Sequence, residues 1–527
     1  MANPTTNDDV RWGAVISVLL GMVAFAFSVS TLSIAIPSIM ADLSADVDSI
    51  QWVVSGFDII QTVVTPTVGW LGGMLGNRNL FLTGISISMV GAALAGMSWS
   101  LESLIIFQLL QGIGAGLMQP TLIAILYGLF PPHRRGLAVA LSMTAFGFGP
   151  TLGPIVAGYL IEYVSWRATF YVQIPIVITS FILTLMTVSN VIESRSRHID
   201  VAGLITMSAF LISLLLAMTQ GRREEWTSPY ILGLFAISGV SFVLFVVIEL
   251  SIANPVVDLR LYCHVPFTMG SLVALLNTIV FRGAGFLMGV FVQQTLQYTP
   301  IQAGYMTAPS GFAFGLMSYL AGKLSDRTGP KLPIIIGMSL FIWLFFWYAD
   351  MDRWTPMIII LQVMVLRPFA FGWTNSPTNF AALQTLPESS VRMGSGLFGL
   401  TRGVASAFGV AMGATILERQ RQVHMLEFSV HAGEAVHSLG DTLGGLQHRA
   451  AELGAGPASA SLSLAMLSQY MHEEAVFAAY QDLFIIGGIL SVATLIPVFG
   501  LPGRWRVAHL RSESETAGKP ASGTKTP

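Results

Sequence analysis

The sequence predicts an all-α polytopic membrane protein. Of its 527 residues, 53% are hydrophobic and only 10% are charged, whereas about a quarter are charged in a typical soluble domain. Apolar runs of roughly 20 residues, the length that crosses the hydrocarbon of a bilayer, recur along most of the chain. The net charge of −2 provides no basic field for nucleic acid. The single cysteine, Cys263, excludes an internal disulfide framework and a cysteine-based metal cluster.

Fourteen apolar runs are predicted to be membrane-spanning helices. The first six lie near 12–37, 51–75, 80–98, 103–127, 136–160 and 167–189, and the next eight near 200–219, 230–252, 267–291, 304–322, 332–349, 356–380, 395–417 and 480–502. The first run is too long for the apolar core of a cleaved signal peptide, and Asp8 and Asp9 precede it where such a peptide is basic. We therefore expect it to be a span.

Lys and Arg are distributed unevenly between the two sides of this predicted topology. With the N-terminus in the cytoplasm, sixteen fall in cytoplasmic segments and four, Arg167, Arg222, Arg223 and Arg353, fall in short outer loops. Cytoplasmic loops of membrane proteins carry an excess of basic residues. Both termini are therefore predicted to be cytoplasmic, with the bilayer as the main partner of the chain.

The predicted spans divide the chain into five segments. They are a cytoplasmic N-terminus (1–11), an N-terminal six-helix half (12–189), an inserted helix pair (190–252), a C-terminal six-helix half (253–502) and a disordered cytoplasmic tail (503–527). The C-terminal half includes a long outer loop, 418–479. Helix-forming stretches around a Gly/Pro/Ser break in this loop predict two short helices joined by a turn.

An internal repeat relates the two predicted halves. The stretch GWLGGMLGNR follows the second span and GKLSDRTGPK follows the tenth. At a constant offset, Gly69 aligns with Gly322 and Gly76 with Gly329. Two repeats of the same orientation are typical of one class of membrane transporter.

The fifth span contains an unusual set of small residues and prolines. Ala145, Gly149, Gly153 and Ala157 recur every four residues and therefore form one stripe along a helix. Such stripes allow close approach of two backbones in lipid, where helices associate by packing. Pro150 and Pro154 each remove a backbone donor, and we expect them to bend the helix.

These motifs resemble those of a known transporter family. The stretch GFGPTLGPIVAGY, which ends just after Gly158, is similar to the antiporter motif in the fifth span of drug exporters of the major facilitator superfamily. The stretches QGIGAG and SWRATFYVQIPI resemble that family's fourth span and the start of its sixth. GKLSDRTGPK is a complete copy of its loop motif, and HIDVAG and PVVDLRLY narrow the resemblance to fourteen-span exporters of the EmrB/QacA type. The stretch RQRQVHMLEFSV resembles the EmrB-like branch.

The resemblance implies a fold and a function. The fold would be the major facilitator fold, with two six-helix halves and two inserted helices. The chain would export amphipathic small molecules, such as drugs and weak organic acids, across a bacterial inner membrane in exchange for protons. The small-residue stripe would pack the fifth span against the other half. Five residues of the loop motif would form a cytoplasmic gate: Gly322, Asp326, Arg327, Gly329 and Lys331. The 418–479 loop would bind a periplasmic membrane-fusion adaptor that leads to an outer-membrane channel.

The sequence departs from this family where proton coupling is usually located. Aligned on Pro37, the acidic residue and the asparagine of the first span are replaced by Ser28 and Ser33, and the arginine of the fourth span is replaced by Gln108. A proton-independent facilitator or importer on the same fold therefore remains an alternative function.

Few charged residues lie inside the predicted spans, and each is costly to insert, by roughly 2.5–3.5 kcal/mol. Asp58 and Arg282 are predicted at similar depth in the outer half, where we expect them to pair in proton coupling or in an outer gate. Gln108, Arg282, Phe286 and Arg367 are expected to line the substrate cavity, by analogy with cavity-lining spans of the family. Alternatively, Asp58 is capped by Ser55 or Thr62, and the arginines bind helix carbonyls. Arg402 is expected to be structural.

Other chemistries lack support in the sequence. There is no phosphate-binding Gly-rich loop with the GK[ST] pattern, so ATP is not expected to drive the process. No supported nucleophile and base are apparent, so the chain is not expected to be an enzyme. The histidines of the outer loop lack ligand spacing, so neither a metal nor another cofactor is expected.

Overall fold

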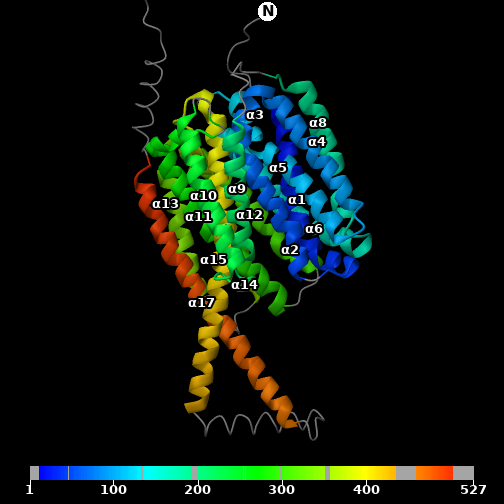
Figure 1. The fold of residues 1–527 in the computed structure, drawn as a ribbon, viewed down its shortest axis with the longest axis vertical. Coiled ribbons are helices and arrows are strands. Elements are labelled where there is room, and N and C mark those ends of the chain that lie inside the picture. Colours follow the sequence, from blue (N-terminus) through cyan, green and yellow to red (C-terminus); the bar gives the residue numbers. More distant parts are fainter. Residues whose placement is uncertain are drawn as a thin grey trace, which may run out of the picture.

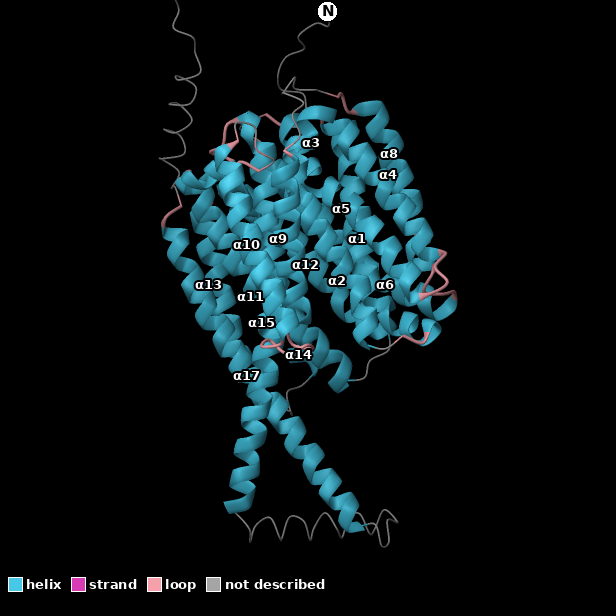
Figure 2. Ribbon diagram, in the orientation of Figure 1, coloured by secondary structure: helices cyan, strands magenta, loops and turns pink. Residues whose placement is uncertain are grey.

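In a computed structural model, residues 11–45, 47–131, 135–190, 200–252, 255, 257–296, 300–350, 357–434 and 459–501 are described. All regular elements among them are helices (Figures 1 and 2). The predicted tail lies outside the described residues, as does the N-terminus except for Arg11. The first half contains α1 (Trp12–Leu43), α2 (Val47–Val64), η1 (Thr65–Thr67), α3 (Val68–Leu75), α4 (Asn77–Gly96), α5 (Leu101–Leu129), α6 (Arg135–Tyr163), α7 (Ala168–Tyr171) and α8 (Ile174–Thr187).

The rest of the chain contains the inserted pair and the second half. The pair is α9 (Val201–Gln220) and α10 (Pro229–Ser251). The second half contains η3 (Leu259–Cys263), α11 (Val265–Leu296), α12 (Pro300–Thr328), α13 (Lys331–Ala349), α14 (Met357–Leu383), α15 (Glu388–Glu434) and α17 (Ser459–Phe499). Each of the fourteen predicted runs is therefore mainly helical.

Eleven helices of the described part are long and apolar enough to cross a membrane. The three predicted spans outside this set correspond to α2, α12 and α14. These helices carry polar residues in mid-helix, among them Asp58 in α2 and Arg367 in α14. Part of each of these three helices also lies outside the residues whose side chains the structure describes.

The bundle has two distinct ends, which are visible in Figure 1. One end carries the connection between α3 and α4 and the connection between α12 and α13, and we call it the loop end. Gly76 and Gly329 lie in these connections, after the second and tenth predicted spans, with φ of 77° and 86°. They are the glycines with positive φ in the described part of the chain, and the internal repeat aligned them with each other. At the opposite end, α15 and α17 project beyond the other helices. We call this the stalk end, and we call the projecting parts of α15 and α17 the stalk.

The long interface between the halves is formed by α6 and α12, but not by the predicted stripe. A Cβ at Gly147 would lie 2.8 Å from the Gly311 carbonyl oxygen and 3.0 Å from the Cα of Gly315. Thr144 Oγ1 donates to the Gly315 carbonyl over 3.3 Å. Gly147, the α6 glycine that contacts the other half, therefore lies two residues before Gly149 of the predicted set.

The predicted stripe packs within its own half. A Cβ at Gly149 would collide with the backbone of Ala26, and one at Gly153 would lie 2.9 Å from Ser30 Cβ. Both partners belong to α1. The expectation that this stripe contacts the other half was wrong, because α6 has close neighbours on two faces and the spacing did not indicate which face meets which helix. Pro150 and Pro154 lie inside the continuous helix α6, and Gly158 is buried.

The predicted outer loop is described in part. The predicted turn and the helix before it lie outside the described residues, whereas α15 continues through the predicted membrane boundary to Glu434 and α17 begins at Ser459. The loop is therefore formed largely by extensions of two spans, which separate from each other in Figure 1. Residues 435–458 lie outside the described residues.

Candidate functional site

The two halves also meet at the loop end, in a seam between α2–α3 and α15. Glycines allow the helices to approach each other closely along this seam. A Cβ at Gly69 would lie 3.1 Å from Met393 Cα, and one at Gly396 would lie 3.4 Å from Pro66 Cα. A Cβ at Gly399 would lie 2.7 Å from Thr65 Cγ2, and one at Gly403 would lie 2.5 Å from Thr62 Cγ2. The seam thus closes the loop end as far as Thr62.

Asp58 lies one helical turn beyond this seam. It precedes Thr62 by four residues, so both residues lie on the face of α2 that meets α15. Thr62 Oγ1 donates to the backbone carbonyl oxygen of Asp58 over 2.8 Å. The side-chain carboxylate of Asp58 takes no part in this bond. The Asp58 side chain is exposed, although it belongs to the middle of the bundle. The exposed carboxylate therefore lies just beyond the end of the seam.

Arg282 belongs to α11, in the second half of the chain, and its side chain is also exposed. Its helix packs closely on α15, because a Cβ at Gly283 would lie 2.8 Å from the Gly409 carbonyl oxygen. The Arg282 charge attracts that of Asp58 and repels those of Arg367 and Arg402. Among the described residues, Asp58 and Arg282 form no ion pair. The two opposite charges therefore lie near enough to interact but form no ion pair in this conformation.

Arg367 binds a helix carbonyl, the alternative that the sequence left open. Its Nη1 donates to the Phe281 carbonyl oxygen over 2.8 Å, and its guanidinium lies 4.6 Å from the centre of the Phe281 ring. Gly285 gives it room, since a Cβ there would lie 2.5 Å from Nη1. Arg367 therefore fixes α14 to α11 beside Arg282, which differs from the expected position in an open cavity. The Phe286 side chain lies outside the described residues.

Gln108 is not an open cavity residue either. It is 2% exposed, and its Oε1 is buried without a hydrogen-bond partner. Its neighbour Gln111 donates from Nε2 to Ser28 Oγ over 2.8 Å. A neutral amide and a hydroxyl therefore connect α5 to α1 where the resemblance led us to expect charged groups.

Sequence reasoning missed a buried polar set in the second half. Asn277 Nδ2 donates to Thr374 Oγ1 over 2.6 Å, and Asn379 Nδ2 donates to Asn375 Oδ1 over 2.8 Å. All four side chains are buried. The signal was present in the stretch WTNSPTNF, which is unusually polar for the last part of a predicted span.

The expected gate residues lie at the loop end. Gly322 and Gly329 are buried, and Asp326 and Arg327 are exposed. Lys331 Nζ donates to the Phe499 carbonyl oxygen over 3.1 Å. This bond attaches α13 to the end of α17 within the second half.

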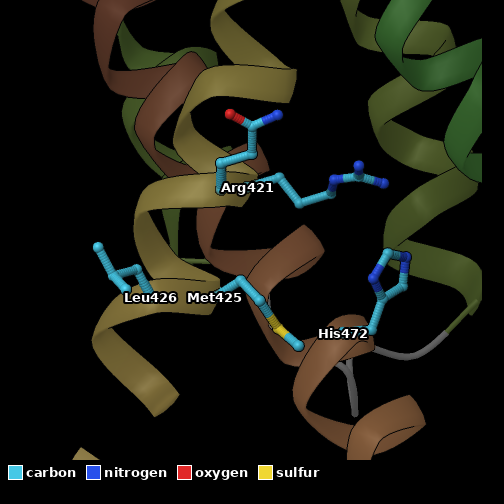
Figure 3. Close-up of a pocket in the computed structure, with 5 residues that line it drawn as sticks. Arg421, Met425, Leu426 and His472 are labelled. Carbon is cyan, nitrogen blue, oxygen red and sulfur yellow. The ribbon is translucent and has the colours of Figure 1, made fainter. Parts of the chain in front are cut away.

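The stalk contains a pocket of about 350 Å³, shown in Figure 3. Its lining residues are Arg421, Gln422, Met425, Leu426 and His472. Figure 3 shows the Arg421 and His472 side chains reaching toward the same side, with the Met425 thioether between the two helices.

Polar contacts join the stalk helices next to this pocket. Gln420 Nε2 donates to Asp482 Oδ2 over 2.7 Å, and His424 Nε2 lies 2.8 Å from the same oxygen. These contacts hold α15 to α17 where the two helices leave the bundle.

Two helical halves that close against each other at one end, with opposite charges exposed beyond the closure, define a membrane transporter. The chain belongs to the Major Facilitator Superfamily, whose family model matches residues 18–410. Members of this family are transporters and not enzymes.

Several relatives are exporters or transporters by name. The multidrug export protein EmrB of Haemophilus influenzae is 28% identical over 432 residues, which cover 80% of this chain and 84% of the relative. The tetracenomycin C resistance and export protein of Streptomyces glaucescens is 24% identical over 503 residues, 93% of this chain and 91% of the relative. The riboflavin transporter RibZ of Clostridioides difficile is 26% identical over 402 residues, 76% and 87% of the two chains.

Solved structures share the fold at low sequence identity. The human organic anion transporter MFSD10 superposes with a TM-score of 0.58 at 15% identity, over 92% of this chain and 100% of that one. The proton:xylose symporter XylE gives a TM-score of 0.56 at 14% identity, over 94% and 96%.

Proposed function

We propose that this protein is a fourteen-span secondary active exporter of the EmrB-like branch. It carries amphipathic small molecules, including drugs and weak organic acids, across a bacterial inner membrane in exchange for protons. The relatives named as export proteins support this direction of transport. The observation that carries the proposal is that Asp58 and Arg282, which have opposite charges, are both exposed just beyond the closed seam and form no ion pair with each other.

In this proposal the loop end faces the cytoplasm, as the distribution of Lys and Arg predicts. With the seam closed, Asp58 faces the outer side and takes up a proton. When the halves rock so that the seam opens, the outer side closes and brings Asp58 to Arg282. Pairing with a cation favours the charged carboxylate, so the proton leaves on the cytoplasmic side.

The test is proton-driven uptake into inverted membrane vesicles. Asp58→Asn should abolish transport driven by a pH gradient but retain substrate binding, and Arg282→Ala should impair it partially. Asp42→Asn, which changes an acid near the end of α1 that lies on the stalk side, is the matched control and should transport normally. Normal proton-driven transport by Asp58→Asn would exclude the coupling role.

The charges favour anionic substrates. Arg282, Arg367 and Arg402 interact electrostatically with one another or with Asp58, so this region holds three positive charges and one negative charge. A permanently cationic substrate would be repelled here more strongly than in water. Export of quaternary ammonium dyes without export of any organic acid would refute this assignment.

A proton-independent facilitator or importer is the second candidate. It is favoured by the neutral hydrogen bond between Gln111 and Ser28, since neither side chain titrates in the physiological range. An uncoupler distinguishes the two: it should abolish net export by the antiporter and leave facilitated flux unchanged.

We also propose that the stalk binds a periplasmic adaptor, which would give a route across two membranes. Its projection beyond the other helices supports this (Figure 1). Deleting roughly residues 430–465 should abolish resistance in intact cells but spare uptake into inverted vesicles. Equal loss in vesicles would instead assign the stalk to the transporter itself.

A further inference from the structure

A row of five phenylalanine rings crosses the boundary between the two halves. Phe25 in α1 lies 6.1 Å from Phe146 in α6, and Phe146 lies 6.4 Å from Phe314 in α12. The row continues through Phe371 in α14, at 5.8 Å from Phe314, to Phe281 in α11, at 3.8 Å from Phe371. All distances are between ring centroids. We call these residues the aromatic row.

The row ends beside the charged groups of the candidate site. Arg367 lies over the Phe281 ring and binds its backbone carbonyl, and Arg282 is the next residue along α11. At the other end, Phe25 precedes Ser28 by about one turn, on the side toward the loop end. The row therefore extends from the part of α1 beside Ser28 to the charged groups of the candidate site.

The members of the row differ in exposure. Phe25, Phe314 and Phe371 are buried, at 7%, 6% and 6%. Phe146 and Phe281 are only half-buried, so each half contributes one accessible ring, supported from behind by buried rings. Phe371 stacks on Phe281, and the Arg367 guanidinium lies over the Phe281 ring. A further aromatic group can therefore present its face to the edge of Phe281, which is one of the favoured arrangements of two aromatic rings.

We propose that the aromatic row recognises an aromatic ring of the substrate, with Phe146 and Phe281 as the contacting residues. The proposal rests on the proposed export of weak acids and narrows it to a chemical class: planar aromatic acids whose anionic group lies toward Arg282. Because the two rings belong to different halves, a bound aromatic substrate contacts both halves at once. Saturated acids of the same size and charge lack the π-face and bind more weakly.

The experiment compares 1-naphthoate with its fully saturated decahydro analogue, by calorimetry on the protein in nanodiscs. An aromatic pair adds about a 2- to 12-fold preference beyond area burial, so the wild type should prefer naphthoate by about this factor. Phe281→Leu and Phe146→Leu should each reduce the preference toward unity, mainly by weakening naphthoate. Phe210→Leu removes a half-buried ring of the inserted pair, which lies tilted against the Phe242 ring, and should keep the preference.

The outcomes separate this inference from the proposed function. Equal binding of both acids by the wild type, or an unchanged preference in a folded Phe146→Leu or Phe281→Leu variant, would overturn the role of the row. The neutral alcohols 1-naphthalenemethanol and its saturated analogue provide the second pair. If they show the preference while neither acid binds, the row stands and the anionic substrate class fails. Binding of none of the four probes overturns the inference.

Discussion

Gly311→Ala in α12 is expected to disrupt the contact between the two halves. A Cβ at this position would collide with Thr151 Oγ1 and lie 2.5 Å from the Thr151 backbone nitrogen and 2.6 Å from the Gly147 carbonyl oxygen. Ordinary contact begins near 3.4 Å, so α6 and α12 must move apart by about 0.9 Å or distort. Overpacking of this kind typically costs about 1–3 kcal/mol, and backbone neighbours that cannot rotate away favour the upper part of that range.

The same helix face offers a matched control one turn away. A Cβ at Gly315 would lie 3.4 Å from its nearest atom, which is ordinary contact, so Gly315→Ala should change stability by no more than about 0.5 kcal/mol. Thermal inactivation in detergent, followed by size-exclusion chromatography, measures the stability, and uptake into vesicles measures transport. If Gly311→Ala were as stable and as active as Gly315→Ala, the close packing of α6 on α12 would not be what joins the halves.

Three further predictions concern other contacts. Gly153→Leu should abolish transport without preventing membrane insertion, because a Cβ there already lies 2.9 Å from Ser30 Cβ; normal transport by a well-expressed variant would contradict the packing of α6 on α1. Gly329→Ala should reduce stability by about 1–3 kcal/mol, because its φ of 86° is strained for other residues; equal thermal inactivation of variant and wild type would contradict this. Hydrogen bonds from Trp166 and Arg167 lower the pKa of Asp42, so its stabilising effect is present above the unfolded pKa of about 3.9 and is lost only as the pH falls through the lower folded pKa. The stability difference between wild type and Asp42→Asn should therefore stay constant from about pH 5.5 to 8, and a difference that disappeared across this window would contradict the assignment.

The fold was largely predictable from the sequence because lipid restricts the choices. A chain that must satisfy its backbone groups internally forms helices, and apolar length then locates them. The repeat predicted the equivalence of Gly76 and Gly329, and the positive φ of both residues agrees with it. The predicted spans that correspond to α2, α12 and α14 are helical as well, because each contains an apolar run of sufficient length.

The candidate site was less predictable because it depends on which helix faces meet. The sequence identified Asp58 and Arg282 as unusual charges, but depth alone could not show that they are exposed and unpaired. Gly149 and Gly153 were recognised as packing residues and assigned to the wrong neighbour, since spacing defines a face without naming its partner. Gln111 escaped notice because its role appears only with its hydrogen bond to Ser28, which is 83 positions away in the chain.

The unbroken length of α15 makes it a lever. Its 47 residues extend for about 70 Å, from the seam that closes the loop end to the tip of the stalk. From Gly403, where the seam ends, to Glu434 is roughly 45 Å, so a tilt of about 10° at the seam would move the tip by about 8 Å. A rearrangement of side chains in mid-membrane is thereby amplified into a displacement the size of a helix radius or more at the far end. Anything in contact with the stalk would sense mechanically whether the two halves are open or closed.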